Sequence, residues 1–594
     1  MATTLGRHLV DNALPEKWRG RGVLNKGSLN NMLVEIAKEH PDKYPDIVTK
    51  LKRLGDEVAT LDGISVGLDD IAPRHTERDA ALKPHVEAYR VAKTSGDKEK
   101  ALMGAEDAML TLAKNHPGTM GEMVRSGGRG NAAQLMRAVG APVLARDSKN
   151  KIIPWMITRS FSEGLKPADA WVAGTQARVN AVLSNISVVE PGDLAKILVN
   201  NMNDQLVTMP DCGTKNGISM PGSDPHIIDR YTAATNKLIT PQYASQLSKS
   251  NDPVIVRSPM TCEAAHGVCQ HCQGLSPSGQ LHNIGTNVGV RAAQALAEPL
   301  TQFSLNAKHG GRIDRASDAE PKLEGIKGIR SLLEVPTTFM HRAILAEHDG
   351  EVTDIEKAPQ GGHYVYVGGT QHYVEPEHRV VVKRGDSVYA GDVLSNGVPN
   401  PAEIVRHKGL GDGRRYLVDA LADVYKRSGS EVDKRHLETL AKSVLNHVQI
   451  TDPGPDDAFL KGDIVDYNKF HAALAASKQR VPTTDSHGET LADGILHYTA
   501  GTTITNTIAD NLIKHGVTSV AIAQQGPQAV PVMRPASRNP LLNADWLHRL
   551  GHRYLKETLL SGIHRGDTSD LHGYSPTAAY AAGLDFGNGP DGKY

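Results

Sequence analysis

The spacing of apolar positions changes along the chain from a helical period to a strand-like alternation and back. Residues 1–115 follow a mostly helical pattern, and the charged, alanine-rich segment 76–114 predicts a helical pair broken at Ser95-Gly96-Asp97. Between 340 and 400, alternating β-branched runs separated by glycine turns predict a small antiparallel sheet or barrel. From 411 onward the pattern returns to helices. We therefore expect a multidomain α+β fold that is mainly helical.

Punctuating residues predict where the central helices begin and end. Asn131 is a good N-cap for a helix that follows the glycine-dense stretch before it. Pro167 suits the first position of a helix running to about Val189. Pro191-Gly192 then predicts an interruption, followed by a second helical piece to about Leu206. Farther on, a helix over 288–297 runs into Pro299.

The chain has four cysteines, and they fall into one pattern. Cys262, Cys269 and Cys272 follow a C-x₆-C-x₂-C spacing, and Cys212 stands upstream in P-D-C-G-T. A constellation that uses every thiol predicts a closed, tetrahedral zinc site of the structural kind. Two disulfides are the alternative, but a chain of 594 residues does not depend on such staples. A catalytic zinc is disfavoured because four thiolates leave no open position for water.

Composition limits the classes of function. The 39% of apolar residues suffices for several cores, and no apolar run is long enough to span a membrane. Met1–Gly6 shows no apolar leader, which predicts a cytoplasmic location. Because 66 Lys and Arg face 67 Asp and Glu, contacts with nucleic acid must come from local patches or partner chains. An aromatic content of 4% disfavours a base-stacking, single-strand-binding surface.

The segment T-Q-F-S-L-N-A-K-H-G-G at 301–311 is a candidate for chemistry. If it is helical, one face presents Gln302, Leu305, Asn306 and His309. An amide, an apolar side chain and an imidazole suit the sugar, base and phosphates of a nucleotide. A short helix between Pro299 and a glycine pair is marginal alone, so it could fold over a substrate and unfold again. From the residues alone, the alternative is a capped surface helix with a solvated histidine.

The order of several motifs resembles the C-terminal half of the β′ subunit of multisubunit DNA-dependent RNA polymerases. The family's F-loop is similar to R-S-G-G-R-G-N-A-A-Q-L (125–135), and the entry of its bridge helix is similar to I-T-R-S-F-S-E-G-L (157–165). Its second zinc site is similar to R-S-P-M-T-C-E-A-A-H-G-V-C-Q-H-C (257–272) together with D-C-G-T (211–214). Its trigger loop is similar to the run 284–311. Residues 59–70, 325–336, 343–352 and 383–394 continue the series.

The resemblance implies six parts. They are a funnel-like helical region that follows the active-site domain (1–120), the F-loop and bridge helix (121–206), a zinc-binding module (207–280), the trigger loop (281–325), a small β domain similar to a jaw or sandwich-hybrid domain (326–410), and a C-terminal helical, clamp-associated region (411–594).

The resemblance also implies roles for single residues. Gln302 would touch the ribose of the incoming nucleotide, and Leu305 replaces the methionine that packs on its base. His309 would lie by the triphosphate, where it donates a proton or adds positive charge. Arg129 would support the folded lid from the F-loop, and Lys196 falls where the family has a bridge-helix arginine near template or substrate. Cys212, Cys262, Cys269 and Cys272 would hold the zinc.

The sequence departs from the family at several positions. Asn306 replaces an arginine, and Lys308 replaces a phenylalanine just before the histidine. Pro191 enters a helix that the family keeps unbroken, and Asp193 takes the place of a tyrosine. These departures bear on translocation and fidelity, while the implied reaction class is unchanged.

The metal-binding motif of the family, N-A-D-F-D-G-D, is absent from this sequence. Two-metal nucleotidyl transfer needs clustered carboxylates, and the nearest pairs, Asp69-Asp70 and Asp456-Asp457, read as solvated turn acids. Catalytic Mg²⁺ is therefore expected on a separate β′ N-terminal chain. Other expected partners are one or more β-like subunits, DNA template, RNA product and nucleoside triphosphates, with a specificity factor as a further candidate.

A split β′ subunit occurs in cyanobacteria and plastids and in large bacteriophages, and the short chain with a diverged trigger loop favours a bacteriophage acting in the host cytoplasm. Two rival hypotheses remain: a non-catalytic, zinc-containing assembly or DNA-binding scaffold of the same complex, and an independent zinc-dependent hydrolase, which ligation by four thiolates disfavours.

Overall fold

The computed structural model describes residues 4–542, with gaps at 64, 148–150, 251, 310–322, 337, 456–458, 475–477 and 525, and a few positions between 560 and 566. The chain divides into two compact units, Met1–Ile186 and Ser187–Tyr594. Helices and short strands alternate along the described chain, which confirms the predicted α+β class. The finer division into six parts remains a prediction.

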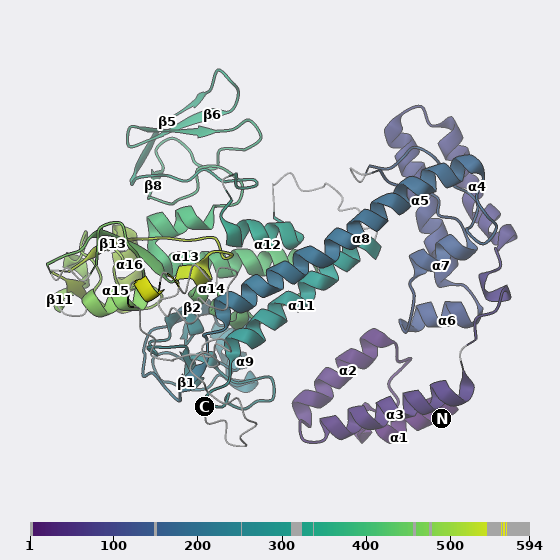
Figure 1. Ribbon diagram of the computed structural model, residues 1–594, viewed down its shortest axis with the longest axis horizontal. Coiled ribbons are helices and arrows are strands. Elements are labelled where there is room, and N and C mark those ends of the chain that lie inside the picture. The colour runs from purple at the N-terminus through teal and green to yellow at the C-terminus, as the bar shows by residue number, and fades with distance from the viewer. Residues whose placement is uncertain are drawn as a thin grey trace. The chain divides into compact units, whose positions relative to one another are not determined.

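The first unit is built from helices, as the sequence predicts (Figure 1). They are α1 (Leu5–Ala13), α2 (Lys26–Glu39), α3 (Tyr44–Asp62), α4 (His75–Val91), α5 (Ser95–Lys114), α6 (Gly118–Ser126) and α7 (Ala132–Val139). The expected helical pair is α4 and α5, but its break lies just before Ser95. Thr94 caps α5 by accepting a hydrogen bond from Asp97 N at 3.1 Å, so Ser95-Gly96-Asp97 forms the first turn of α5.

The predicted cap at Asn131 is confirmed. Its side chain accepts a hydrogen bond from Gln134 N at 2.8 Å, and the Gln134 side chain accepts one from Asn131 N, which makes a capping box at the start of α7. The residues of α7 that face inward join a core made by Leu102 and Met109 of α5, and that core fixes the orientation of the preceding glycine-rich turn.

Helix α8 (Pro167–Met202) corrects one prediction. Pro167 is its first residue, as expected, but the helix continues through Pro191 and is not interrupted there. Pro191, Leu194 and Leu198 are all buried and lie on one face. Proline has no backbone N–H, so it loses one helical hydrogen bond, and a proline inside a helix costs about 3 kcal/mol. The free energy gained by burying this apolar face offsets that cost. A proline at this position is thus compatible with an unbroken helix.

Helix α11 (Val288–His309) also passes through its internal proline, Pro299. Its residues Ala292, Leu296 and Leu300 are fully buried in the main core of the second unit. The other helices of that core are α12 (Gly325–Glu334), α13 (Pro401–Arg427) and α14 (Lys434–Val444). The segment 301–309 therefore forms the last turns of a long, anchored helix, not a short helix of its own.

The predicted small antiparallel sheet is confirmed. Its strands follow the order β7-β6-β5-β8, where β5 is Gly350–Lys357, β6 His363–Val367, β7 Thr370–Val374 and β8 Ser387–Val388. All three pairings are antiparallel. Its inner face buries Val352 of β5, Val365 and Val367 of β6, and Val374 of β7. On β6 the buried residues alternate with more exposed ones, as the pleat of a strand requires.

The predicted return to helices after 411 holds only in part, because strands lie among the helices there. A three-stranded antiparallel sheet is formed by β9 (His447–Asp452), β10 (Ile464–Asp466) and β13 (Gln528–Pro531). A second pair of strands joins β11 (Lys478–Pro482) to β12 (Ser519–Ala523). In sequence, α15 (Tyr467–Leu474) precedes β11, and α16 (Asn506–Lys514) precedes β12. These strands have three to six residues, too few for a clear alternation beside helical segments.

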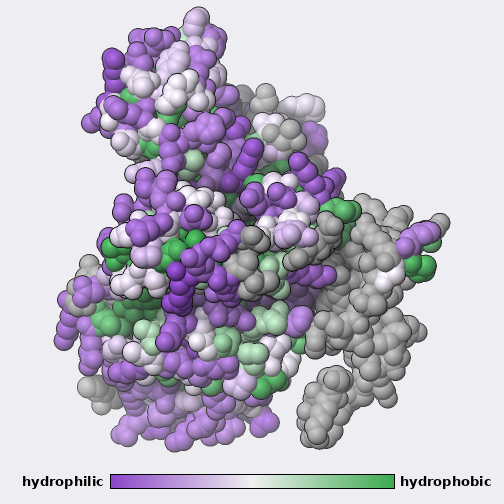
Figure 2. Space-filling model, turned by 90° about the vertical axis from the view of Figure 1, so that its left-hand side faces the viewer, coloured by the Kyte–Doolittle hydropathy of each residue, from purple (hydrophilic) through white to green (hydrophobic). Residues whose placement is uncertain are grey.

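Short elements surround the cysteines. They are β1 (Val207–Met209), β2 (Ile218–Pro221), α9 (Pro241–Ser250), β3 (Pro253–Val256), the 3₁₀ turn η4 (Pro259–Thr261), β4 (Val268–Cys269) and α10 (Gln270–Gln273). The face of the second unit in Figure 2 is mostly hydrophilic, with hydrophobic residues in small scattered groups. Across the part of the chain that the structure describes, every helix is too short or too polar to cross a membrane.

Candidate metal centre

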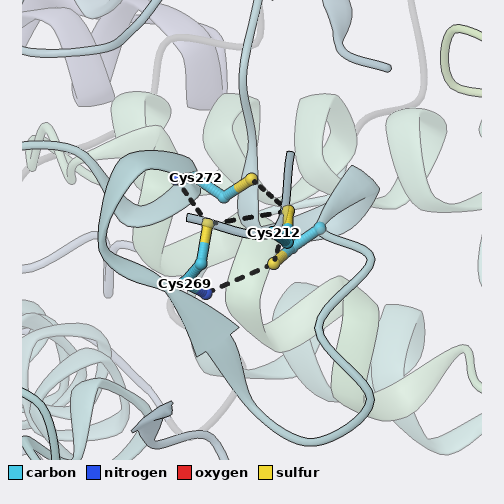
Figure 3. A group of neighbouring side chains, drawn as sticks. Cys212, Cys269 and Cys272 are labelled. Atoms are coloured by element: carbon cyan, nitrogen blue, oxygen red, sulfur yellow. Dashed lines mark hydrogen bonds between the residues drawn. The ribbon is translucent and has the colours of Figure 1, made fainter. Parts of the chain in front are cut away.

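Four separate backbone features bring the cysteines together. Cys262 directly follows the turn η4, Cys269 ends β4, and Cys272 lies in the helical turn α10. Strand β1 pairs in parallel with β4, with Met209 opposite Cys269, so the loop after β1 carries Cys212 to the same place. Figure 3 shows Cys212, Cys269 and Cys272 pointing toward one another.

Gly267 permits the close approach of the two strands. It has a φ of +62°, and a Cβ there would lie 2.1 Å from the carbonyl oxygen of Leu206. The next residue, Val268, donates its N–H to that same oxygen at 2.9 Å. A side chain at 267 is therefore excluded both by conformation and by space.

The sulfur atoms have the spacing of a metal site. Cys212 Sγ lies 3.7 Å from Cys272 Sγ, 3.8 Å from Cys262 Sγ and 3.7 Å from Cys269 Sγ. All four lie within 4.8 Å of one another. Zn–S bonds of about 2.3 Å place the corners of a tetrahedron about 3.8 Å apart. Disulfide sulfurs lie about 2.0 Å apart, so the disulfide alternative is wrong for these four free cysteines.

Backbone N–H groups already point at two of the sulfurs. Cys269 N donates to Cys262 Sγ at 3.3 Å, and Cys272 N donates to Cys269 Sγ at 3.3 Å. Such bonds stabilise sulfur in its negatively charged form. The C-x₆-C-x₂-C segment thus folds into a knuckle whose own backbone N–H groups stabilise the thiolates of Cys262 and Cys269.

The electrostatics of the cluster favour a dication at its centre. Hydrogen bonds from Cys262, Cys269 and Cys272 lower the pKa of the Cys212 thiol, whereas the hydrogen bonds to Cys212, Cys262 and Cys269 raise the pKa of Cys272. An ionised Cys212 sulfur therefore opposes ionisation of Cys272. A bound Zn²⁺ removes this conflict because all four sulfurs then face a positive charge. The residues present fit a zinc ion.

Arg257 lies against the cluster. Its side chain is 1% exposed, and its Nη2 donates to Cys212, Cys272 and Cys269 Sγ at 3.3, 3.4 and 3.5 Å. These three sulfurs form one triangular face of the cluster, and Cys262 Sγ lies on its inner side. Nη2 at these distances on the inner side would collide with Cys262 Sγ, so the guanidinium lies on the outer side of the face. The centre of the cluster stays open to an ion.

A buried ion pair ties this region to α14. Arg230 and Glu438 form two hydrogen bonds of 2.7 and 2.6 Å, and Ser258 Oγ donates to the same carboxylate at 2.7 Å. Lys442, one turn farther along α14, donates to the carbonyl oxygen of Gly267 at 2.9 Å. Helix α14 therefore contacts the cysteine region at Ser258 and at Gly267.

The remaining predicted site residues belong to three different segments of the chain. Arg129 is exposed in the turn after α6, in the first unit, and Lys196 is exposed on α8, in the second. Gln302, Leu305, Asn306 and His309 lie on the last turns of α11, whose backbone is helical to His309. Their side chains, and the glycine pair after them, fall outside the described residues.

Sequence reasoning missed the surroundings of the cysteines. Arg257 stands in the motif R-S-P-M-T-C, five residues before Cys262, yet no side-chain role follows from that spacing alone. Asp211, which precedes Cys212, forms an ion pair with Arg257 at 2.6 Å. Glu438 could not be found from sequence, since its partners Arg230 and Ser258 lie 208 and 180 residues away.

The fold brings four sulfurs into one closed cluster, whose geometry fits a structural metal site without an open coordination position. A family model described as RNA polymerase Rpb1, domain 5, matches residues 164–495, more than half of the chain. The chain therefore belongs to the RNA polymerase Rpb1 domain 5 family, as the motifs indicate.

The chain is similar to proteins named DNA-directed RNA polymerase subunit beta'. It is 26% identical over 535 residues to that of Caldanaerobacter subterraneus subsp. tengcongensis, a match that covers 79% of this chain and 44% of the relative. Identity to that of Clavibacter sepedonicus is 27% over 529 residues, with 80% and 40% covered. For Chloroflexus aurantiacus it is 26% over 607 residues, with 79% and 40% covered. The chain thus matches less than half the length of these curated relatives.

Proposed function

We propose that this chain is a β′-type subunit of a multisubunit DNA-directed RNA polymerase and supplies the trigger loop, the bridge helix and a structural zinc site for template-directed nucleotidyl transfer. The single observation that carries the proposal is the four-sulfur cluster in a chain of this family, with α11 beginning beside it. Val288, the first residue of α11, packs in the same small core as Cys262, Cys269 and Cys272.

In this proposal α11 carries the lid residues. The face that holds Gln302, Leu305 and His309 continues a helix whose earlier turns are fixed by Ala292 and Leu296 in the core. Gln302 contacts the ribose, Leu305 packs on the base, and His309 lies by the triphosphate as a proton donor or positive charge. Arg129 supports the folded lid, Asn306 takes a position near the phosphates, and Lys196, exposed on α8, faces template or substrate.

Catalytic Mg²⁺ belongs, in this proposal, to a separate β′ N-terminal chain. Asp69 and Asp70 are held in the 3₁₀ turn η2 (Asp69–Ile71), where Asp70 Oδ2 accepts the Gly67 N–H at 2.9 Å. This carboxylate has a local structural role, which supports its interpretation as a turn acid. Asp456 and Asp457 lie outside the described residues. We further propose β-like subunits as partners, nucleic acid and nucleoside triphosphates as ligands, and a bacteriophage origin.

A scaffold without catalytic function is the second candidate. Asn306, which lacks the charge of the family's arginine, is the observation that favours it. The other argument for it, an interrupted helix at Pro191, no longer applies because α8 is continuous there.

The test is single-nucleotide addition by the reconstituted complex with His309→Ala and Leu305→Ala chains. If the lid proposal holds, each variant slows addition at saturating nucleotide by about 10-fold or more, since groups that act in the transition state contribute about 10² to 10⁴-fold. His487→Ala, at an exposed histidine far along the chain, is the matched control and should react at the wild-type rate. Unchanged addition by both lid variants would establish the scaffold instead.

A further inference from the structure

Zinc bound by four thiolates leaves two surplus negative charges in a buried place. Cys269 and Cys272 are 0% and 1% exposed, so water contributes little to their solvation. A buried charge is stable only when it is paired or hydrogen-bonded. The protein itself must therefore supply the compensating charge, and the side chains around the sulfurs show where it comes from.

Arg257 is the cation in contact with the sulfurs. Its Nη2 lies 3.3 to 3.5 Å from Cys212, Cys269 and Cys272, and it faces the cluster from outside the triangle that these sulfurs form. Nη2 carries two hydrogens, enough for one bond to Asp211 and one shared among the sulfurs. Arginine remains charged even when buried, which lysine does not always do.

Two neighbours hold the guanidinium in place. Asp211 accepts at 2.6 Å from Nη2, and Asn236 Oδ1 accepts at 2.9 Å from Nη1. Asp211 directly precedes Cys212 in the same short loop. This loop therefore supplies both a carboxylate that orients Arg257 and a sulfur that Arg257 contacts. Asn236 also donates to Asp211 Oδ2 at 3.0 Å, which closes the set of contacts.

From this arrangement we infer that Arg257 is a positioning residue of the metal centre, whose guanidinium neutralises the zinc–thiolate cluster and slows release of the ion. Asp211 and Asn236 orient it. The inference rests on the zinc site proposed above and adds the cation that the site requires. Outer hydrogen-bonding groups of this kind typically change metal affinity by about 10- to 100-fold.

The experiment uses the full chain and compares Arg257→Lys with Arg257→Gln. Lysine retains the charge but not the planar fork, and glutamine retains a donor but not the charge. Zinc affinity and the rate of zinc transfer to a chelating dye are measured at a temperature where every variant is folded. The thiolate-to-metal absorption of the cobalt-substituted protein reports whether all four sulfurs still bind.

Arg230→Met is the matched control. Arg230 is an equally buried arginine of the same region, but its hydrogen bonds go to Glu438 and to the backbone oxygens of His226 and Arg257. It therefore reproduces the loss of a buried arginine and its destabilisation without removing the charge beside the sulfurs.

We expect Arg257→Gln to lower zinc affinity about 10- to 100-fold and to speed zinc transfer, with Arg257→Lys in between. Arg230→Met loosens α14 but leaves the charge beside the sulfurs, so its affinity should stay closer to the wild-type value than that of either Arg257 variant. Equal affinity of Arg257→Gln and wild type, an equal loss in the lysine and glutamine variants, or an equal loss in Arg230→Met would each overturn the inference. A wild-type chain that binds no zinc would instead remove the zinc site itself, so the two failures are distinguishable.

Discussion

Arg230 and Glu438 are 208 residues apart in sequence and form a two-point ion pair in which each side chain is 1% exposed. The guanidinium also donates to the backbone of His226 and Arg257, and the carboxylate accepts from Ser258. This pair fixes the segment that leads into the cysteine knuckle against α14. Its loss should therefore affect both elements.

Glu438→Gln should destabilise the packing of α14 on the cysteine region by about 3–5 kcal/mol, because a buried guanidinium is left without its counter-charge. Amide hydrogen exchange of α14 measures the effect locally. Lys434→Met, which removes the partly exposed ion pair with Asp224 at 2.9 Å, is the control and should cost about 1 kcal/mol or less. Equal protection of α14 in Glu438→Gln and wild type would contradict the assignment.

One zinc ion per chain should be found by elemental analysis, and Cys269→Ser should lose it, because structural zinc sites contribute folding free energy directly. His271→Ala is the matched control within the same C-Q-H-C segment. Its imidazole stacks on Tyr231 with ring centroids 4.4 Å apart and contacts Asp211 at 3.2 Å. Retained zinc in His271→Ala shows ligation by four cysteines, and its loss would point to a histidine ligand.

Gly289→Ala should disturb the junction of α8 and α11. A Cβ at 289 would lie 1.8 Å from the Met202 carbonyl oxygen, so the helices must separate, at a cost of about 1–3 kcal/mol. Gly192→Ala provides a control of opposite sign, since this helical glycine has open space around it and alanine favours helix by about 1 kcal/mol. Chemical denaturation of the two variants should shift in opposite directions, and parallel shifts would refute the stated packing.

The Asp433 carboxylate should make stability depend on pH. Burial alone would raise its pKa, but hydrogen bonds and charge from Arg435 lower the pKa of Asp433 well below its usual value. A folded pKa below the unfolded value of about 3.9 means that this stabilisation is present above about pH 4 and is lost as the pH falls further. Asp433 also caps α14 by accepting from Arg435 N at 2.9 Å.

The check is denaturation between pH 3 and 7 for wild type and Asp433→Asn. The variant should be less stable at pH 7, and its stability should fall less steeply toward pH 3. Asp423→Asn, at a more exposed aspartate paired within α13, is measured alongside as a surface comparison. A wild-type slope in Asp433→Asn would show that this carboxylate titrates alike in both states.

The local parts of the fold were predictable. The cap at Asn131, the start of α8 at Pro167 and the antiparallel sheet follow from residue types within a few positions. The four cysteines were likewise predictable as a group, because thiols have few other uses in such a pattern. The passage of α8 through Pro191 was not, since it depends on which face the rest of the molecule buries. Glu438 and Arg257 have roles set by long-range contacts, which a single sequence does not reveal.

The order in which the metal centre is made has a practical consequence. Cys212 leaves the ribosome first, the sulfur of Cys272 follows 60 residues later, and the carboxylate that holds Ser258 comes a further stretch behind at Glu438. A fragment cut between Cys272 and Glu438 contains all four cysteines but lacks the contacts that α14 makes with the cysteine region. The metal content of such a shortened product will therefore underestimate how firmly the intact polypeptide retains the proposed zinc ion.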